Sequence, residues 1–243
     1  LSLERYSQSI SLLEKFTPLK TSPERFWVVL GNAYFLNEQP DEAVDVAKNW
    51  IEVQPNNKDA YLRLIALHDS LKNNTQALDA AKLAQKRFST DDQFNMLVTY
   101  FNLVTDDVSA AQRSFDNLSE SAKNSVVGQG LFGQILLAKG EPAAALPKLK
   151  IFYQQKANQV NATLVAKAMK EMNQYPQAIA FLQEHQQKVN KSIASEVQIA
   201  ELAILSDDYD FAVKQYEAVL ELDPNNSRAL NNLAYILIEQ GSY

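Results

Sequence analysis

The chain has 243 residues and a net charge of −6, with 46% hydrophobic and 21% charged residues. This composition is typical of an ordered protein, and its acidic balance argues against nucleic-acid binding. There is no cysteine, which excludes disulfides and thiolate chemistry. No stretch approaches the ~18 consecutive apolar residues of a transmembrane helix, so we expect no membrane insertion within this chain.

The first predicted elements are helices. Residues 3–16 carry apolar side chains at helical spacing and predict one helix. Residues 23–37 predict a second helix, with Trp27 and Tyr34 on the same face. A third begins at Pro40, which suits the first helical position because the N–H that proline lacks would be unpaired there. The second and third helices therefore form a pair joined by a short turn.

The same pair recurs along the chain. One alanine stands at the same place in each second helix, at intervals of 34, 34, 34, 33 and 34 residues. These alanines are Ala43, Ala77, Ala111, Ala145, Ala178 and Ala212. A small residue once per ~34 residues indicates a stack of similar units, each with one close helix crossing. We expect no room for a bulky side chain at Ala77, Ala212, Gly31 or Gly133.

Turn residues separate the two helices of each pair. They occur at 37–40, 72–75, 105–107, 139–142, 173–176 and 206–208. The sequence therefore predicts an all-α solenoid in a single domain, 1–243. Its half repeats are 1–23 (a second helix) and 227–243 (a first helix), and its full repeats are 24–57, 58–91, 92–125, 126–158, 159–192 and 193–226.

The fourth repeat departs from this pattern. Pro147 lies inside its second helix, where it removes one backbone hydrogen bond and should kink or delay the helix. Three of the six glycines of the chain, Gly128, Gly130 and Gly133, lie in the first helix of the same repeat. We therefore expect the solenoid to be most irregular around 126–160.

Both ends of the predicted stack are apolar. The last helix carries Leu230, Leu233 and Leu237, and no second helix follows it. Solenoids normally finish in polar capping helices. We therefore expect this chain to be a piece of a longer protein, and we expect its end helices to pair with another copy, swap or fray.

Two repeats carry the clearest motif. They read Trp27-x2-Leu30-Gly31-x2-Tyr34 with Ala43 and Pro55, and Tyr209-x2-Ala212-x3-Tyr216-x2-Val219-x4-Pro224. They resemble the tetratricopeptide repeat family, and in looser form the resemblance covers nearly the whole chain. It implies a right-handed superhelical solenoid of antiparallel helix pairs, with about six full repeats and a half repeat at each end. It also implies a non-enzymatic scaffold that binds a protein or peptide along its concave surface.

The resemblance also suggests where the protein acts. The sequence from Leu222 to Tyr235 is similar to large bacterial tetratricopeptide lipoproteins. The lack of cysteine also suits a bacterial periplasm slightly better than the cytoplasm, so we slightly favour the periplasm, with an anchor in a missing N-terminal segment, over the cytoplasm. A self-associating structural protein that uses its solenoid ends is the alternative function. An accessory domain, whose chemistry lies outside this chain, is the third.

In the family, the first helix of each pair lines the concave surface. The residues that the resemblance places there as partner-binding candidates are Asn32, Phe35, Arg63, Tyr100, Gln134, Lys167, Lys170 and Tyr235. The aromatic ones would anchor an extended segment, and the polar ones would hydrogen-bond to it. Alternatively, side chains such as Phe35 only fill the narrow inside of the superhelix. A chaperone-tail clamp is disfavoured, because Val28 stands where that clamp has Lys.

Candidate residues for catalysis are lacking. His68 and His185 are 117 residues apart and stand at positions that normally pack between helices, so we expect neither a metal site nor an enzyme, and no cofactor. Charge is uneven. Residues 139–191 hold eight Lys and three Glu, or +5, whereas residues 192–243 hold one Lys and one Arg against nine acidic residues, or −7. This pattern indicates either solvated helix faces or a charged path that orients a ligand.

Overall fold

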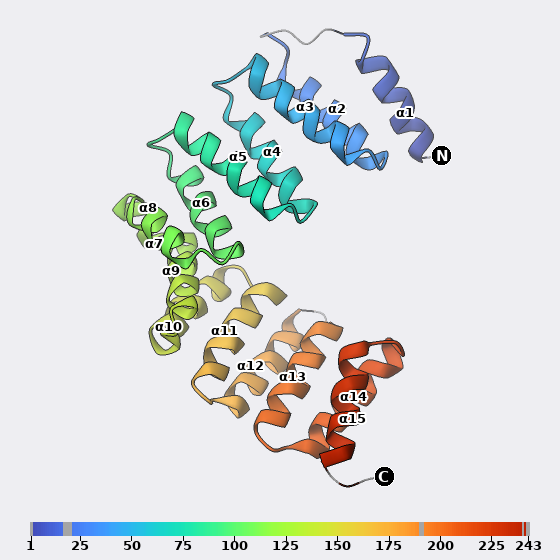
Figure 1. Cartoon of the computed structure of the whole chain (residues 1–243), viewed down its shortest axis with the longest axis vertical. Helices are drawn as coiled ribbons and strands as arrows, with labels where there is room; N and C mark the ends of the chain where they lie inside the picture. The colour runs from blue at the N-terminus through green and yellow to red at the C-terminus, as the bar shows by residue number, and fades with distance from the viewer. Residues whose placement is uncertain (1, 17–20, 190–191, 240, 242–243) are drawn as a thin grey trace. The chain divides into compact units, whose positions relative to one another are not determined.

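The computed structural model of the chain describes residues 2–16, 21–189, 192–239 and 241. These residues form fifteen α-helices and no strand, so the predicted all-α solenoid of helix pairs is confirmed (Figure 1). The helices divide into two compact units, Leu1–Ser119 and Glu120–Tyr243. The prediction of a single domain stays a prediction. Residues 1, 17–20, 190–191, 240 and 242–243 of the predicted repeats lie outside the described part.

Unit 1 contains seven helices, each packed on its neighbours in the chain. They are α1 (Ser2–Leu13), α2 (Glu24–Leu36), α3 (Pro40–Val53), α4 (Lys58–Ser70), α5 (Asn74–Arg87), α6 (Asp92–Val104) and α7 (Val108–Asp116). Unit 2 contains eight. They are α8 (Glu120–Asn124), α9 (Val126–Ala138), α10 (Pro142–Gln155), α11 (Gln159–Glu171), α12 (Tyr175–Lys188), α13 (Ile193–Leu205), α14 (Tyr209–Leu222) and α15 (Ser227–Glu239).

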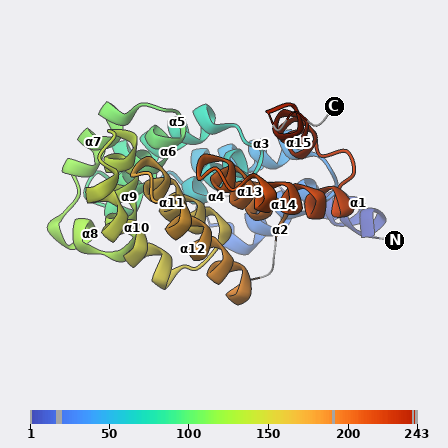
Figure 2. The same cartoon turned by 90° about the horizontal axis from the view of Figure 1, so that it is seen from below.

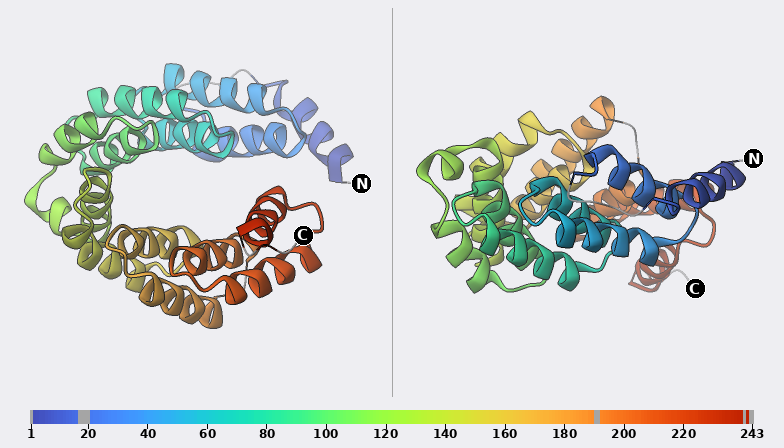
Figure 3. Two further views of the ribbon diagram at one scale, coloured as in Figure 1. Left: turned by 60° about the horizontal axis from the view of Figure 1, so that its bottom comes forward. Right: turned by 90° about the horizontal axis from the view of Figure 1, so that it is seen from above.

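Apart from the short α8, the helices are of two kinds. The first helices of the pairs, called A helices, are α2, α4, α6, α9, α11, α13 and α15; the second, called B helices, are α1, α3, α5, α7, α10, α12 and α14. Within each unit the two kinds form two layers (Figure 3). In unit 2, for example, α11, α12 and α13 lie side by side (Figure 2). Residues one repeat apart are called equivalent below.

Each A helix that precedes a B helix ends in the same turn. One residue per turn has a positive φ: Glu38, Lys72, Asp106, Gly140, Asn173 and Asp207. The N–H after it donates to the carbonyl five residues back, as from Gln39 to Tyr34 at 3.0 Å. This is the Schellman motif, which satisfies carbonyl groups at a helix end. Because it recurs at the repeat interval, each chain reversal has the same geometry.

The recurrent alanines lie at the helix crossings. All six of them are fully buried. At the first crossing, a Cβ added to Gly31 of α2 would lie 4.0 Å from the carbonyl oxygen of Ala43 on α3. The backbones of the two helices therefore approach closely at this point, as the spacing of the alanines predicts.

The crossing of α9 and α10 depends on glycine. A Cβ at Gly133 would lie 2.9 Å from the Leu149 side chain, and a Cβ at Gly130 would lie 2.6 Å from the Phe152 ring. Two large side chains of α10, three residues apart, thus rest on two glycines of α9, also three residues apart.

The expectation that the solenoid is most irregular around 126–160 is wrong. Helix α10 begins at Pro142, runs through Pro147 and has 14 residues, as do α3, α5, α12 and α14. Pro147 removes one hydrogen bond, but the close packing of α10 on α9 retains the helix. The irregular B helix is α7, with nine residues. The segment after it is held by the Asp92 carboxylate, which accepts from the Ser119 backbone N–H at 3.0 Å.

Glycine-to-alanine variants test this packing. Alanine at Gly31 would meet only ordinary contacts, the nearest being Val46 at 3.7 Å, so alanine fits there, whereas the expectation that a bulky side chain does not fit stays a prediction. Because alanine favours the helix, Gly31→Ala should stabilise unit 1 by up to about 1 kcal/mol. Gly133→Ala should destabilise unit 2 by about 1–2 kcal/mol, because Leu149 is buried and cannot move aside. Denaturant unfolding measures both, and equal effects of the two variants would contradict the crossing.

Candidate functional site

The exposed face of the A helices in unit 2 contains a cleft of about 330 Å³. It lies between α11 and α13, with one residue from α15, and is called the α11–α13 cleft. Its lining consists of Thr163, Lys167, Lys170, Ala194, Gln198, Glu201, Leu202, Leu205 and Arg228. Two of the candidate residues, Lys167 and Lys170, therefore share one site.

A row of hydrogen bonds orients the polar side of this cleft. Ser192 Oγ donates to Gln159 Oε1 at 3.2 Å, and Gln159 Nε2 donates to Thr163 Oγ1 at 3.3 Å. Thr163 Oγ1 in turn donates to Gln198 Oε1 at 3.1 Å. Because the oxygen of Gln198 accepts this bond, its amide NH2 group is left as a donor at the cleft.

The cleft carries both signs of charge. Arg228 Nη2 donates to Glu201 Oε2 at 2.8 Å, and Arg228 Nε pairs with the other oxygen of the same carboxylate. These two charges therefore compensate each other. The exposed ammonium of Lys167 lies 3.8 Å from Glu171, a distance at which a partly exposed pair gains little. The two lysines thus supply the positive charge that a ligand would meet.

An apolar edge completes the site. Leu202 is buried beneath the cleft, whereas Leu205 is 42% exposed. Both project from α13, one helical turn apart. A ligand in the cleft can therefore contact ammonium groups, an amide donor and an apolar side chain at once.

Three of the four candidates on the A helices of unit 1 lie in two separate places. Arg63 Nη2 donates to Asn32 Oδ1, and burial lowers the pKa of the guanidinium. The hydrogen bond between Arg63 and Asn32 satisfies part of the hydrogen-bonding capacity of both side chains. Tyr100 is 37% exposed, and its ring packs on Phe101 with centroids 4.9 Å apart. Burial, and secondly the Asp69 carboxylate, raise the pKa of Tyr100.

The remaining candidates have different surroundings. Phe35 is half-buried and packs against the core of unit 1. This packing fits the alternative in which Phe35 only fills the inside of the superhelix. Gln134 is half-buried, and its Nε2 donates to the Gly130 carbonyl of its own helix at 3.4 Å. Tyr235 is 50% exposed on α15 and does not line the cleft.

The sequence reasoning missed several lining residues, above all Gln198 and Arg228. Both follow from the repeat interval. Gln198 is equivalent to Arg63 of α4 and Leu164 of α11, and Arg228 is equivalent to Ala194 of α13. A candidate list that included these two positions of each A helix, in addition to the position equivalent to Asn32, would have contained Gln198 and Arg228. Only some of the lysines of residues 139–191 line the cleft. Others have partners elsewhere: Lys188 pairs with Glu184, and Lys148 donates to Gln129.

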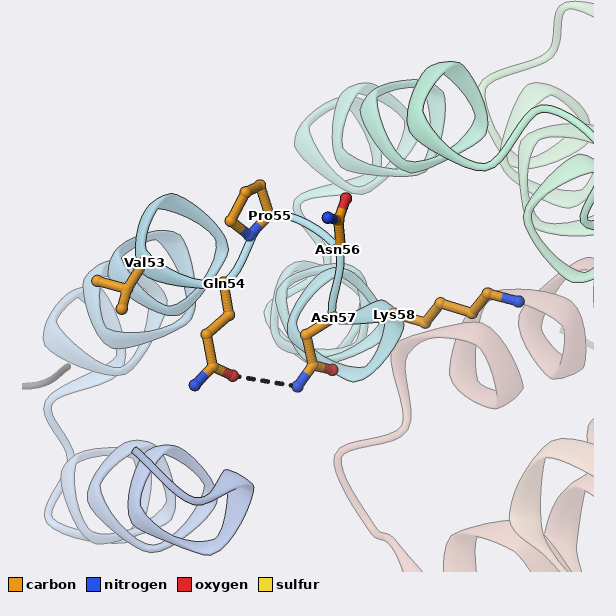
Figure 4. Close-up of a pocket in the computed structure, with 6 residues that line it drawn as sticks. All are labelled: Val53, Gln54, Pro55, Asn56, Asn57 and Lys58. Carbon is orange, nitrogen blue, oxygen red and sulfur yellow. Dashed lines mark hydrogen bonds between the residues drawn. The ribbon is translucent and has the colours of Figure 1, made fainter. Parts of the chain in front are cut away.

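A second hollow, in unit 1, has a structural explanation. It is formed by residues 53–58 of the α3–α4 turn and measures about 630 Å³. Gln54 and Asn57 point toward each other, and Asn57 Nδ2 donates to Gln54 Oε1 at 3.2 Å (Figure 4). Lys58 pairs with Asp91 of the next such turn. These side chains brace successive repeats, so we do not treat this hollow as a binding site.

Both histidines pack within the helices, as expected. His185 is 1% exposed, and its Nδ1 lies 2.9 Å from the Tyr153 hydroxyl. Burial lowers the pKa of His185; burial, and secondly Lys48, lower that of His68. The described residues include no cluster of His, Cys, Asp or Glu arranged to hold a metal ion. None of the described helices combines the length and apolarity needed to cross a bilayer.

Three family models match parts of the sequence. Each is described as tetratricopeptide repeat, and they match residues 24–67, 197–226 and 215–243. A comparison with curated proteins finds no match.

Solved structures with this fold are numerous, and three are informative. A chain of the APC/C hetero-tetramer Cut9–Hcn1 matches 97% of this chain with 14% identity and a TM-score of 0.73. The match spans only 46% of the length of the Cut9–Hcn1 chain. A tetratricopeptide repeat protein from Parabacteroides merdae matches 97% with 10% identity and a TM-score of 0.72, over 92% of its length. YrrB, described as having an unusual peptide-binding site, matches 78% with 13% identity and a TM-score of 0.54, over 98% of its length. At these identities the likeness concerns the fold.

The buried His185 predicts a pH dependence of stability. Its lowered pKa keeps it neutral in the folded chain, whereas the unfolded chain takes up a proton near the ordinary value of 6.5. Its contribution is therefore present above about pH 6.5 and lost as the pH falls toward the lowered pKa. His185→Asn, whose side-chain amide can either donate to or accept from the Tyr153 hydroxyl, should lose less unfolding free energy than wild type between about pH 7 and 5. Identical pH slopes in denaturant titrations would contradict this.

Proposed function

The chain belongs to the tetratricopeptide repeat family, and we propose on that premise that its α11–α13 cleft binds an extended, acidic segment of a partner protein. Proteins of this family are generally non-enzymatic scaffolds for protein–protein interaction. The single observation that carries the proposal is the position of Lys167 and Lys170 beside the oriented Gln198 amide in one cleft. Because Lys167 pairs with Glu171 only at 3.8 Å, whereas Arg228 pairs with both oxygens of Glu201, the two lysines would attract a carboxylate.

The other groups of the cleft fit the backbone of such a segment. The NH2 group of Gln198 is placed to donate to a peptide carbonyl, and Leu205 offers an apolar contact to a neighbouring side chain. The peptide-binding site of YrrB, a protein of similar fold, supports the same use of the repeats. The unit 1 residues Asn32, Arg63 and Tyr100 stay proposed contacts of a longer ligand, as do Phe35, Gln134 and Tyr235.

The wider context also stays a proposal. A bacterial periplasmic lipoprotein is the setting suggested by the sequence, and a self-associating assembly protein remains the alternative function. The alternative makes a different prediction, because association of copies through the end helices does not require Lys167 or Lys170.

Peptides that differ only in charge test the proposal. Fluorescence anisotropy would compare labelled, unstructured peptides in which the same positions hold Glu, Gln or Lys. The Glu peptides should bind most tightly, and added salt should weaken them, because the contact is a partly exposed charge pair. Lys170→Glu should weaken binding by about tenfold, since it replaces attraction with repulsion.

The matched control is Lys150→Glu. Lys150 is exposed on the B helix α10 of the same unit, so this variant changes the net charge equally without touching the cleft. It should bind the Glu peptides as wild type does. Equal binding of Glu and Gln peptides, or equal weakening by the two variants, would contradict the proposed site.

A further inference from the structure

Unit 2 contains a second cavity besides the α11–α13 cleft. It measures about 400 Å³ and is called the α12–α14 cavity. Its lining consists of Gln183, Gln186, Gln187, Glu196 and Gln215. The first three lie on the B helix α12, Glu196 lies on α13 and Gln215 lies on the B helix α14. None of these residues lines the α11–α13 cleft, so the two sites are separate.

Every lining side chain of the α12–α14 cavity is polar. Glu196 is 7% exposed, so a largely buried carboxylate forms part of the wall. Gln186 and Gln215 are half-buried, whereas Gln183 and Gln187 are exposed. The described part of the chain contributes no basic and no aromatic side chain to this lining. The cavity therefore disfavours an apolar group, and it disfavours an anion, which Glu196 would repel.

The amide of Gln186 lacks part of its hydrogen bonding. Its Nε2 atom is buried and has no hydrogen-bond partner. The His185 Nε2 and Ser195 Oγ atoms, which belong to the chain neighbours of Gln186 and Glu196, are also buried without partners. Buried polar atoms are nearly always paired in folded proteins. Three unpaired atoms on the packed helices α12 and α13 therefore indicate that a further polar group is accommodated there.

Unit 1 shows which group occupies the corresponding place. Gln186 is equivalent to Gln85, and Glu196 is equivalent to Asn95. Gln85 Nε2 donates to Asn95 Oδ1 at 2.9 Å. Gln186 Nε2 has no such acceptor. The group that Gln186 lacks is therefore of the kind that Asn95 supplies, which is a carboxamide.

A carboxamide also fits the other groups of the cavity. Its oxygen can accept from Gln186 Nε2, and its NH2 group can donate to Glu196, because a carboxylate accepts several hydrogen bonds. The amides of Gln183, Gln187 and Gln215 can pair with it in either orientation, since each has a donor and an acceptor. A cation could not accept from Gln186, and an anion could not donate to Glu196.

We propose that the α12–α14 cavity binds the side-chain carboxamide of a glutamine or asparagine residue in a partner protein. The exposed Gln183 and Gln187 lie at the surface, where such a side chain can enter. A protein is the source that we favour, because the chain belongs to a family of protein-binding scaffolds. Since the cavity and the α11–α13 cleft share no residue, this proposal stands or fails independently of the proposed binding of an acidic segment.

Blocked pentapeptides Gly-Ser-X-Ser-Gly, in which X is Gln, Glu, Lys or norleucine, test the proposal. Nuclear magnetic resonance would follow the side-chain NH2 signals of Gln186 and Gln215 in the whole chain, each assigned from a variant that lacks it. The Gln peptide should shift both signals. The other three should need at least about tenfold higher concentration, because their side chains cannot both accept from Gln186 and donate to Glu196.

Free L-glutamine, titrated in parallel, distinguishes a partner protein from a small molecule as the source of the carboxamide. It should bind less tightly than the Gln peptide, because it lacks the peptide backbone that can contact the exposed Gln183 and Gln187. No shift with the Gln peptide, equal shifts with the Lys or norleucine peptide, or tighter binding of free glutamine would overturn the proposal.

Gln186→Leu removes the proposed donor. It should keep the fold, because Ile51 and Leu220 occupy equivalent positions and pack against the cores of their units. The variant should bind the Gln peptide about tenfold more weakly, measured from the Gln215 signal. The matched control is Gln177→Leu, at an exposed position of α12 outside the lining, which should bind as wild type does. Undiminished binding by Gln186→Leu, or equal weakening by the two variants, would overturn the proposal.

Discussion

The close crossing of an A helix and a B helix at one small residue is the constraint on which the structure depends. All six recurrent alanines are fully buried, and the backbone of α2 lies next to the Ala43 carbonyl. At this separation the large side chains on either side of the crossing can pack against the facing helix. The turn that closes each pair must then have a fixed geometry, which explains why a positive φ recurs at the same interval.

Because of this constraint, the packing at the helix crossings recurs in every repeat, whereas the exposed face of the A helices varies from repeat to repeat. The position equivalent to Asn32 holds a different kind of side chain in almost every repeat. In chain order it is occupied by Asn32, Ala66, Tyr100, Gln134, Lys167, Glu201 and Tyr235. All of these are exposed or half-buried. Since the helix crossing does not depend on this position, its chemistry is free to serve a ligand, and in α11 it contributes Lys167 to the cleft.

The sequence was sufficient for the features that recur. The interval of the alanines predicted the helix pairs, and the turn residues predicted where each reversal occurs. It was misleading where a single residue suggested a defect. Pro147 does not interrupt α10, because Leu149 and Phe152 rest on Gly133 and Gly130. The short α7 had no equally clear signal, and the segment after it makes a contact that no repeat pattern specifies, from Ser119 to the distant Asp92.

The candidate site was predictable only in part, for the same reason. Lys167 and Lys170 follow from the face of one helix, which a repeat pattern specifies. The donor of Gln198 and the compensation of Arg228 by Glu201 depend on side chains from neighbouring helices. A pattern along the chain fixes which face a residue occupies, but it does not specify which hydrogen bonds form across that face.

The most direct test of the account is the unfolding free energy of Ala77→Leu and Ala212→Leu, with Ala66→Leu as control. Ala77 and Ala212 are fully buried, whereas Ala66 is exposed on α4. Denaturant unfolding should show losses of about 1–3 kcal/mol for the first two and a change within about 0.5 kcal/mol for the control. If the two crossing variants unfold at the same denaturant concentration as wild type, small residues do not set the helix spacing, and the account is contradicted.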